Sequence, residues 1–494
     1  MSSALIRVEG INLSAVLDDT DDISVFRGAS MLLRQAVKDL TSFKTTNREW
    51  SKQLKAISIG ASIGLYRYSG DSVDKTCEKI ATYLNKHENY RHFTFAVASE
   101  TMADDKADFR RAEETLLAHI RFQQQKSISL AVPEESKTSN ICEFDKLRPA
   151  SEKEIPEETD KLKKRNHASA SVRARFEFGR DQRQQFYIDE LGLDKNAAPN
   201  FTTDLHELTD SASFSNLNDK MAVIYFDGNS FGKIQTTCKT TGDLKTWDDT
   251  IRGLRREYLK ALLDMAKVDE HFRNGEKLQL ETLLWGGDEL MLVVPAWRGM
   301  KVLQHFYQLS DDWEHNNIPL RHAGGIVFCN RKTPIARIRK LARELADDIK
   351  ELADKETQNK QYKTENYFDY LVLKSIDYPT QSLKKHFEQY YRNIPGRKPL
   401  KAIPNWESLL TEQEGILENI PRRQLQKLVQ ALTKGIDSPE YQQAQDRIRE
   451  LMGDDDFAKA ESLCAALFPE QDDAWQWVHL FELWDYIAPQ PEAN

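Results

Sequence analysis

Short hydrophobic runs of strand length alternate with longer amphipathic stretches in the second half of the chain. Runs of this length and spacing predict strands, and apolar positions at helical spacing predict helices. Proline near the start of the last stretch is typical of a helix beginning. The predicted order is a strand at Met221–Phe231, a helix at Trp247–Met265, a strand–turn–strand at Leu278–Trp297, a helix at Met300–Trp313, a strand at Leu320–Phe328 and a long helix after Pro334.

The first half repeats this order weakly. A strand at Ala4–Leu13 carries Glu9-Gly10 where the second half carries Asp227-Gly228. The three later elements are a strand–turn–strand at 56–68, a strand at 90–99 and a helix at 108–122. The shared order and similar spacings indicate a duplicated unit.

The order strand–helix–strand–strand–helix–strand is the ferredoxin-like pattern. We therefore predict an α+β protein with two ferredoxin-like, palm-type (nucleotide-cyclase-like) domains. The first and third strands of this pattern are antiparallel neighbours, which places Asp227 beside Asp288 and Glu289. The predicted domains are a degenerate first palm (1–132), a basic insert or linker (133–217), a second palm (218–396) and a C-terminal helical domain (397–494).

The insert contains a basic segment, Lys161–Tyr187, with eight Lys or Arg against Glu177 and Asp181. A solvated linker or surface helix explains this pattern as well as a segment that meets the phosphates of RNA or a nucleotide. In the C-terminal domain, Trp and Leu recur at helical spacing, which favours a packed core over a binding surface. We interpret that domain as a packing or docking module.

Composition narrows the possible classes of function. The 494 residues are 40% hydrophobic and 30% charged with a net charge of −9, which fits a globular protein and argues against nucleic-acid affinity over the whole surface. The five cysteines are scattered without a CxxC pair, so we expect a reducing, cytoplasmic setting. No membrane span and no signal peptide are expected from the apolar runs.

The paired acidic motifs suit metal-dependent phosphoryl transfer. Such transfer needs hard divalent cations, and these prefer carboxylate oxygens. DGN and GGDE are each common turns alone, but clustered acids repel one another unless a cation lies between them. We predict Asp227, Asp288 and Glu289 as catalytic and metal-binding residues. The predicted nucleotide-binding residues are Gly228, Asn229, Ser230, Gly286, Gly287 and Lys350.

Other polar residues carry weaker signals. His92 and His322 each precede a strand, and a structural role is favoured for both. For Lys350, a solvated helix face explains the pattern as well as contact with a triphosphate does. The sequence contains no Walker-type loop, no HExxH helix, no Ser–His–Asp arrangement and no HD dipeptide.

These motifs resemble a known family. YFDGNSFGK, WGGDELMLVVP and the segment HAGGIVFCNRKTPIARIRKLARELADDIK are similar to the palm motifs of the large subunit of type III CRISPR effector complexes, which makes cyclic oligoadenylates from ATP. RGAS (Arg27–Ser30) resembles part of the degenerate first palm, and CEFDKLRPA (Cys142–Ala150) resembles the insert. Diguanylate cyclases share the GGDD-like turn alone.

The resemblance implies a nucleotidyltransferase that uses two Mg²⁺ or Mn²⁺ ions to convert ATP into a cyclic or short 3′–5′ oligoadenylate in antiviral defence. The implied partners are guide-RNA effector subunits and target RNA, with a homo-oligomer as the stand-alone case. The implied role of Lys350 is contact with the triphosphate. Two alternatives stay open: a non-catalytic scaffold of an RNA-guided complex, and a stand-alone GTP-using cyclic-dinucleotide synthase.

Three departures from the family pattern limit these implications. Glu289 replaces an aspartate, so the product is not fixed by the resemblance. The HD nuclease domain is lacking, so no DNA cleavage is implied. The insert has only Cys142 where family members often have several cysteines, so structural zinc is not implied. The first palm carries Gly60–Ile63 in place of GGDE and is expected to be inactive.

Overall fold

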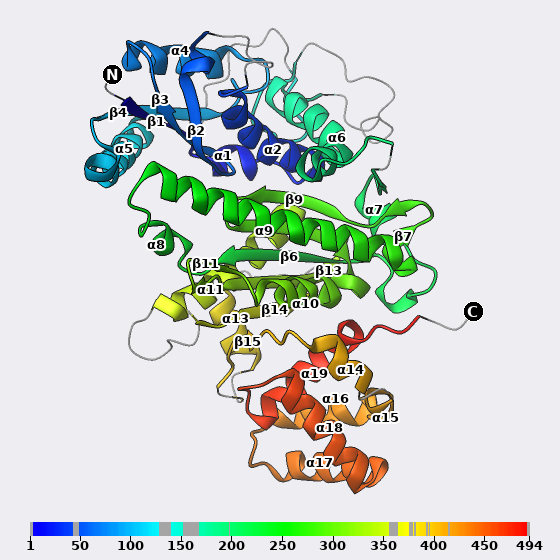
Figure 1. Ribbon diagram of the computed structural model, residues 1–494. Coiled ribbons are helices and arrows are strands. Elements are labelled where there is room, and N and C mark those ends of the chain that lie inside the picture. The colour runs from blue at the N-terminus through cyan, green and yellow to red at the C-terminus, as the bar shows by residue number, and fades with distance from the viewer. Residues whose placement is uncertain are drawn as a thin grey trace.

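A computed structural model shows two sheet-containing domains followed by a bundle of helices (Figure 1). It describes residues 3–42, 49–127, 140–151, 167–196, 198–354, 364–374, 379, 382–391, 394, 396–412 and 415–491. The first domain lies at one end, the larger second domain in the middle and the C-terminal helices at the other end. Among these described residues, no helix is both long enough and apolar enough to cross a membrane.

The first domain contains a four-stranded antiparallel sheet in the order β2-β3-β1-β4. Its first and third strands are neighbours, as expected from the sequence. Helices α2, α4 and α5 accompany the sheet. The elements are β1 (Ser3–Ile11), α1 (Ser14–Leu17), α2 (Ile23–Asp39), β2 (Leu54–Ile59), β3 (Ile63–Tyr68), α4 (Val73–Lys86), β4 (Thr94–Met102) and α5 (Asp105–Lys126).

The second domain is built on a six-stranded sheet in the order β15-β14-β13-β6-β10-β9. The main elements are β6 (Lys220–Gly228), α8 (Phe231–Gln235), α9 (Thr241–Val268), β9 (Glu281–Gly286), β10 (Glu289–Pro295), α10 (Gly299–Ser310), β13 (His322–Asn330), α11 (Ile335–Asp354), β14 (Tyr367–Val372), α13 (Leu383–Tyr390) and β15 (Leu400–Lys401). Strand β14 pairs in parallel with β13 and was not expected from the sequence. Strand β15 pairs with β14, so the sheet continues beyond residue 396, where the sequence analysis placed the end of the second domain.

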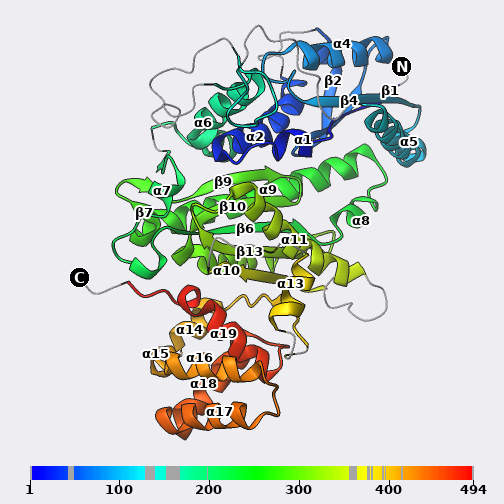
Figure 2. The same ribbon diagram turned by 180° about the vertical axis from the view of Figure 1, so that it is seen from behind.

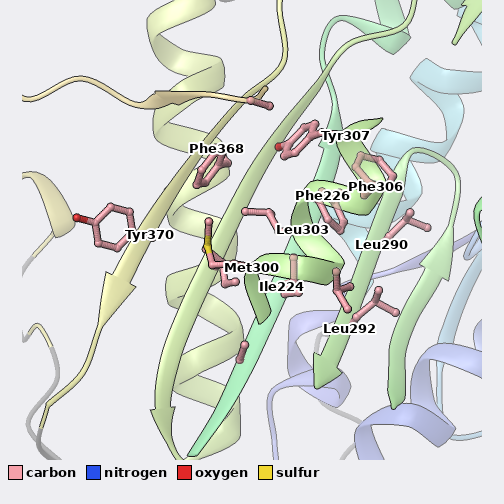
Figure 3. Packing of buried hydrophobic residues seen from close by; sticks show 14 of the residues in the cluster. Ile224, Phe226, Leu290, Leu292, Met300, Leu303, Phe306, Tyr307, Phe368 and Tyr370 are labelled. Carbon is pink, nitrogen blue, oxygen red and sulfur yellow. The ribbon is translucent and has the colours of Figure 1, made fainter. Parts of the chain in front are cut away.

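Strand β6 is the centre of the second domain, and eight of its nine residues are buried. Alternate residues point to opposite faces of a strand, so each face can form a separate core. Ile224 and Phe226 pack with α9 and α10, whereas Val223 and Tyr225 pack with α11. Figure 3 shows the first core, where Met300, Leu303, Phe306 and Tyr307 of α10 lie beside β6 and β10. Figures 1 and 2 show α9 and α11 on opposite faces of this sheet.

The described part of the insert is dominated by α6 (Ala170–Leu191), which crosses α2 closely. A Cβ atom on Gly28 would lie 1.7 Å from the carbonyl oxygen of Arg175, and one on Gly179 would lie 2.0 Å from that of Ser24. Glycine at both positions therefore permits the two helix backbones to touch. This part of the insert is packed as part of the fold and is not a solvated linker.

The C-terminal domain is helical, as the sequence predicts. Its helices are α14 (Trp406–Glu412), α15 (Ile416–Asn419), α16 (Arg422–Leu432), α17 (Pro439–Met452), α18 (Asp454–Leu467) and α19 (Asp473–Ile487). Trp475 and Trp477 of α19 are buried, in agreement with the expectation that these tryptophans form a core. His479 is buried among them and its ring nitrogen meets the hydroxyl of Tyr370 on β14 at 2.8 Å, which ties this bundle to the second sheet.

Glu190 at the end of α6 connects the first and second domains. It forms ion pairs with Arg34 of α2 and, at 3.7 Å, with Arg256 of α9, and it accepts a hydrogen bond of 3.3 Å from the indole of Trp285 on β9. Burial alone would raise the pKa of Glu190. The neighbouring Arg34, Lys38 and Arg255 outweigh burial and lower it to about 2.

Replacing Glu190 with Gln should therefore destabilise the fold in a pH-dependent way. A carboxyl whose folded pKa is depressed stabilises the protein above its unfolded pKa, near 4.5, and loses that contribution as pH falls toward 2. We expect Glu190→Gln to lower the free energy of unfolding at pH 7 by about 3 kcal/mol, and by much less near pH 3. Urea unfolding at both pH values measures this, with exposed Glu257→Gln as the control. An equal loss at both pH values would contradict the ion-pair account.

Candidate active site

The acidic motifs meet at the ends of β6 and β10. Strand β10 pairs with β6 through Leu290 opposite Phe226, so Glu289 enters the sheet level with Asp227. Glu289 also pairs with Gly286 across the β9–β10 hairpin, which leaves Gly287 and Asp288 as a two-residue loop. Gly287 has a φ of 57°, which glycine adopts without strain at the first position of such a loop. The register thus brings Asp227, Asp288 and Glu289 to one edge of the sheet.

Lys350 of α11 reaches this acidic edge. Its Nζ atom lies 2.6 Å from Oδ2 of Asp227. Two further residues that the sequence pattern did not single out also contact the site. The hydroxyl of Tyr225 donates a hydrogen bond of 2.7 Å to Oε1 of Glu289, and Nη2 of Arg343 lies 3.7 Å from the same oxygen.

The periodicity of strands and helices could have identified Tyr225 and Arg343 from the sequence. Tyr225 stands two positions before Asp227 on a strand, where side chains two apart share a face. Arg343 stands two helical turns before Lys350, so both point from the same side of α11. An aromatic hydroxyl and a guanidinium on those faces are placed to orient the carboxylate of Glu289.

Burial and neighbouring acids raise the pKa of Asp227 and of Asp288. Burial, the charge of Asp288 and the charge of Glu289 raise the pKa of Asp227 to about 7, although Lys350 acts in the opposite direction. Burial and Glu289 likewise raise the pKa of Asp288 against the effect of Lys350. These shifts show that negative charges lie close together at this edge of the sheet, and a cation would relieve their repulsion.

The residues present fit a hard divalent cation chemically. In their present positions, no group of three or more His, Cys, Asp or Glu side chains among the described residues could hold a metal ion. Instead, the ammonium group of Lys350 supplies positive charge at Asp227. Asp227, Asp288 and Glu289 would hold Mg²⁺ or Mn²⁺, since carboxylate oxygens are the ligands these ions prefer.

The residues after Asp227 shape the turn into α8. A Cβ atom on Gly228 would lie 2.5 Å from the ring of Phe231, so glycine lets that ring pack on the backbone. Asn229 is buried, and its backbone N–H donates a hydrogen bond of 2.7 Å to the carbonyl oxygen of Arg321. Ser230 has a φ of 59° at the start of α8. These residues build a tight, fixed turn beside the acids.

A small pocket lies beneath the hairpin loop. Its lining includes Phe231, Leu254, Arg255, Asp288, Trp313 and His322. His322 is buried among aromatic rings, and burial together with Lys350 and Arg321 lowers its pKa to about 3. It is therefore neutral at physiological pH, which agrees with the structural role expected for it.

The first domain touches the candidate site directly. A Cβ atom on Gly286 would lie 2.3 Å from Cβ of Ala61, so the two hairpin turns pack against each other. Nearby, the hydroxyl of Ser58 and the backbone N–H of Ile59 donate hydrogen bonds of 3.0 and 3.3 Å to Asp248 on α9. Glycine at position 286 therefore permits close contact between the two domains as well as the hairpin turn.

The corresponding edge of the first domain has a different chemistry. The carboxylate of Glu9 is bound by Arg7 at 2.8 Å and by Arg121 at 2.9 Å. The turn Gly60–Ile63 carries no acid. Glu9 is thus neutralised by two arginines, whereas Asp227 has one lysine and two acidic neighbours.

Known proteins resemble this chain in fold but not in sequence. No family model and no curated protein matches the sequence. Solved structures do match: Csm1 from T. onnurineus, the apo Csm1–Csm4 cassette and the Csm1–Csm4 cassette in complex with cA4. Each has a TM-score of 0.54 and 12% identity, over 99% of this chain and 70% of the other. The chain has a Csm1-like fold.

Proposed function

We propose that this Csm1-like chain is a nucleotidyltransferase that joins ATP units into a cyclic or short 3′–5′ oligoadenylate in CRISPR-type antiviral defence. One observation carries the proposal: Asp227, Asp288, Glu289 and Lys350 meet at adjacent strand ends in this fold. Solved Csm1–Csm4 cassettes in complex with one ATP and with cA4 support the choice of nucleotide and product.

The proposed mechanism assigns a task to each side chain. Asp227, Asp288 and Glu289 would hold the divalent ions, and Lys350 would move from Asp227 to the triphosphate. When bound, the ions neutralise the phosphates and activate the attacking hydroxyl. Glu289 holds an ion or takes the proton of the ribose hydroxyl, and the hydroxyl of Tyr225 orients its carboxylate.

The asymmetry between the two domains gives a direct prediction. Glu9→Ala should cost far less activity than Asp227→Ala, because Glu9 is neutralised by Arg7 and Arg121 and has no acid in the neighbouring turn. We expect Asp227→Ala to lower turnover about 10³-fold and Glu9→Ala to lower it less than about tenfold. Initial rates of pyrophosphate release from ATP measure both. Equal losses would mean that the first domain is also catalytic.

The partners are proposed from the same resemblance. Csm1 is found with Csm4 in the solved cassettes. We propose that this chain assembles with guide-RNA effector subunits and responds to target RNA, with a homo-oligomer as the stand-alone form. Activity should therefore be measured with and without RNA.

A panel of nucleotides tests the proposed reaction. Purified protein is incubated separately with ATP, GTP, CTP and UTP, with Mg²⁺ or Mn²⁺, with and without single-stranded RNA. Conversion of ATP alone is the expected result. Preference for GTP would favour a cyclic-dinucleotide synthase. Binding of ATP without turnover under every condition would favour a scaffold.

A further inference from the structure

Helices α2, α6 and α9 lie near one another between the first and second domains (Figure 1). Five basic side chains gather there. Arg34 and Lys38 come from α2, and Arg252, Arg255 and Arg256 come from one stretch of α9. All of them act electrostatically on Glu190 or on one another. We call these five residues the interdomain basic cluster.

Two buried acids only partly neutralise this cluster. Glu190 pairs with Arg34, with Arg256 at 3.7 Å and with Lys38 at 4.0 Å. Asp248 pairs with Arg252 and also accepts hydrogen bonds from Ser58 and Ile59. Five cations therefore face two carboxylates, with Asp249 as a more exposed third at 3.8 Å from Arg252.

The surplus of positive charge affects the pKa of Lys38, and Arg255 has unpaired N–H groups in the part of the chain that the structure describes. Burial and the charges of Arg34, Arg252 and Arg256 lower the pKa of Lys38 to about 8, although Glu190 raises it. Arg255 is only 6% exposed, and within the described residues its Nε and Nη1 atoms have no hydrogen-bond partner. A buried guanidinium normally pairs its N–H groups, so this site lacks an acceptor.

The cluster has a buried side and an open side. Arg255 lines the pocket that also contains Asp288, so the buried side adjoins the candidate active site. Lys38 and Arg256 are 39% and 49% exposed, so the open side is accessible to a ligand. Arginine forks and lysine ammonium groups bind phosphate oxygens well.

We propose that the interdomain basic cluster binds a chain of phosphate groups next to the hairpin at Asp288. The ligand is a polyphosphate or the phosphate backbone of a short RNA. Lys38 and Arg256 would contact it from the open side, and Arg255 would complete the site from within. Binding of this kind requires no divalent ion and no turnover, so it can succeed or fail independently of the proposed reaction.

The predicted basic segment is a separate candidate for a polyanion site, and the structure describes only part of it. In Lys161–Tyr187, residues 161–166 lie outside the described residues. Arg175 is fully buried in an ion pair of 2.8 Å with Asp19, and Arg183 donates a hydrogen bond to the carbonyl oxygen of Thr203. Two arginines that looked like surface cations in the sequence therefore have structural partners.

The test compares two pairs of substitutions with the same change in charge. Lys38→Gln with Arg256→Gln removes two exposed cations of the cluster. Lys260→Gln with Lys267→Gln removes two cations from α9 outside it. Binding of a fluorescent 12-nucleotide RNA and of inorganic tripolyphosphate is measured with EDTA at several salt concentrations, and thermal unfolding confirms that both variants fold.

We expect the cluster variant to bind at least one of the two ligands about tenfold more weakly, while the control changes little. The salt dependence of RNA binding should flatten by about 0.7 for each phosphate that the variant no longer neutralises. Weaker binding of RNA alone identifies a nucleic-acid backbone, and weaker binding of both ligands identifies a general polyphosphate site. Equal affinities of the wild type and the cluster variant for both ligands would overturn the proposal, as would an equal weakening in the control.

Discussion

Asp288→Asn should abolish nucleotide polymerisation, lowering turnover by at least about 10³-fold, while the protein stays folded. Asp288 stands in the hairpin loop, where burial and Glu289 already raise its pKa. The substitution removes a proposed metal ligand together with a repulsive charge beside Asp227. The melting temperature should therefore stay level or rise, because the cluster is arranged for binding and not for stability.

A matched control uses an acid elsewhere in the same domain. Asp264→Asn makes the same chemical change at an exposed position on α9 and should leave turnover and melting temperature unchanged. Turnover of Asp288→Asn equal to that of the wild type would remove the acidic cluster from the mechanism. A large fall in melting temperature would show instead that Asp288 has a structural role.

Gly286→Ala is expected to lower activity about 100-fold through a shift of the hairpin. The added Cβ would lie 2.3 Å from Cβ and 2.6 Å from Cα of Ala61, so one of the two turns must move. A displacement of about 1 Å at a reacting group can cost 10²-fold in rate. Crowding of this kind also typically costs about 1–3 kcal/mol of stability.

The control for this substitution is Gly232→Ala in α8. A Cβ at Gly232 meets no atom within 4 Å among the described residues, so activity should be nearly unchanged. Initial rates and urea unfolding of both variants measure the effect. Wild-type activity of Gly286→Ala would mean that contact between the two turns does not position the catalytic hairpin.

The sequence allowed the location of the candidate site to be predicted. Two rules were enough: strand order places the first and third strands together, and Asp227 and Asp288 stand at their adjacent ends. The structure has this order in both sheets. For Lys350, the sequence did not decide between a solvated position on the helix and a role in the site. In the structure its Nζ atom lies 2.6 Å from Oδ2 of Asp227.

Contacts between segments far apart in the chain could not be predicted in this way. Nothing near Gly286 indicates that Ala61 packs against it, because that contact depends on how two domains dock. The interdomain basic cluster has the same origin, since Arg34 and Arg255 come from separate domains. Charge counted along the chain predicted a basic segment at Lys161–Tyr187, and it did not show that one of its arginines, Arg175, is buried in an ion pair with Asp19.

The most direct test of the central claim is the product that the purified protein makes from ATP. ATP is supplied with Mn²⁺ or Mg²⁺, with and without RNA, and the products are identified by mass spectrometry and by digestion with a 3′–5′-specific nuclease. We predict adenylate oligomers with 3′–5′ linkages for the wild type and none for Asp288→Asn. Absence of any oligomer from the wild type under all these conditions, with ATP bound, would contradict the account.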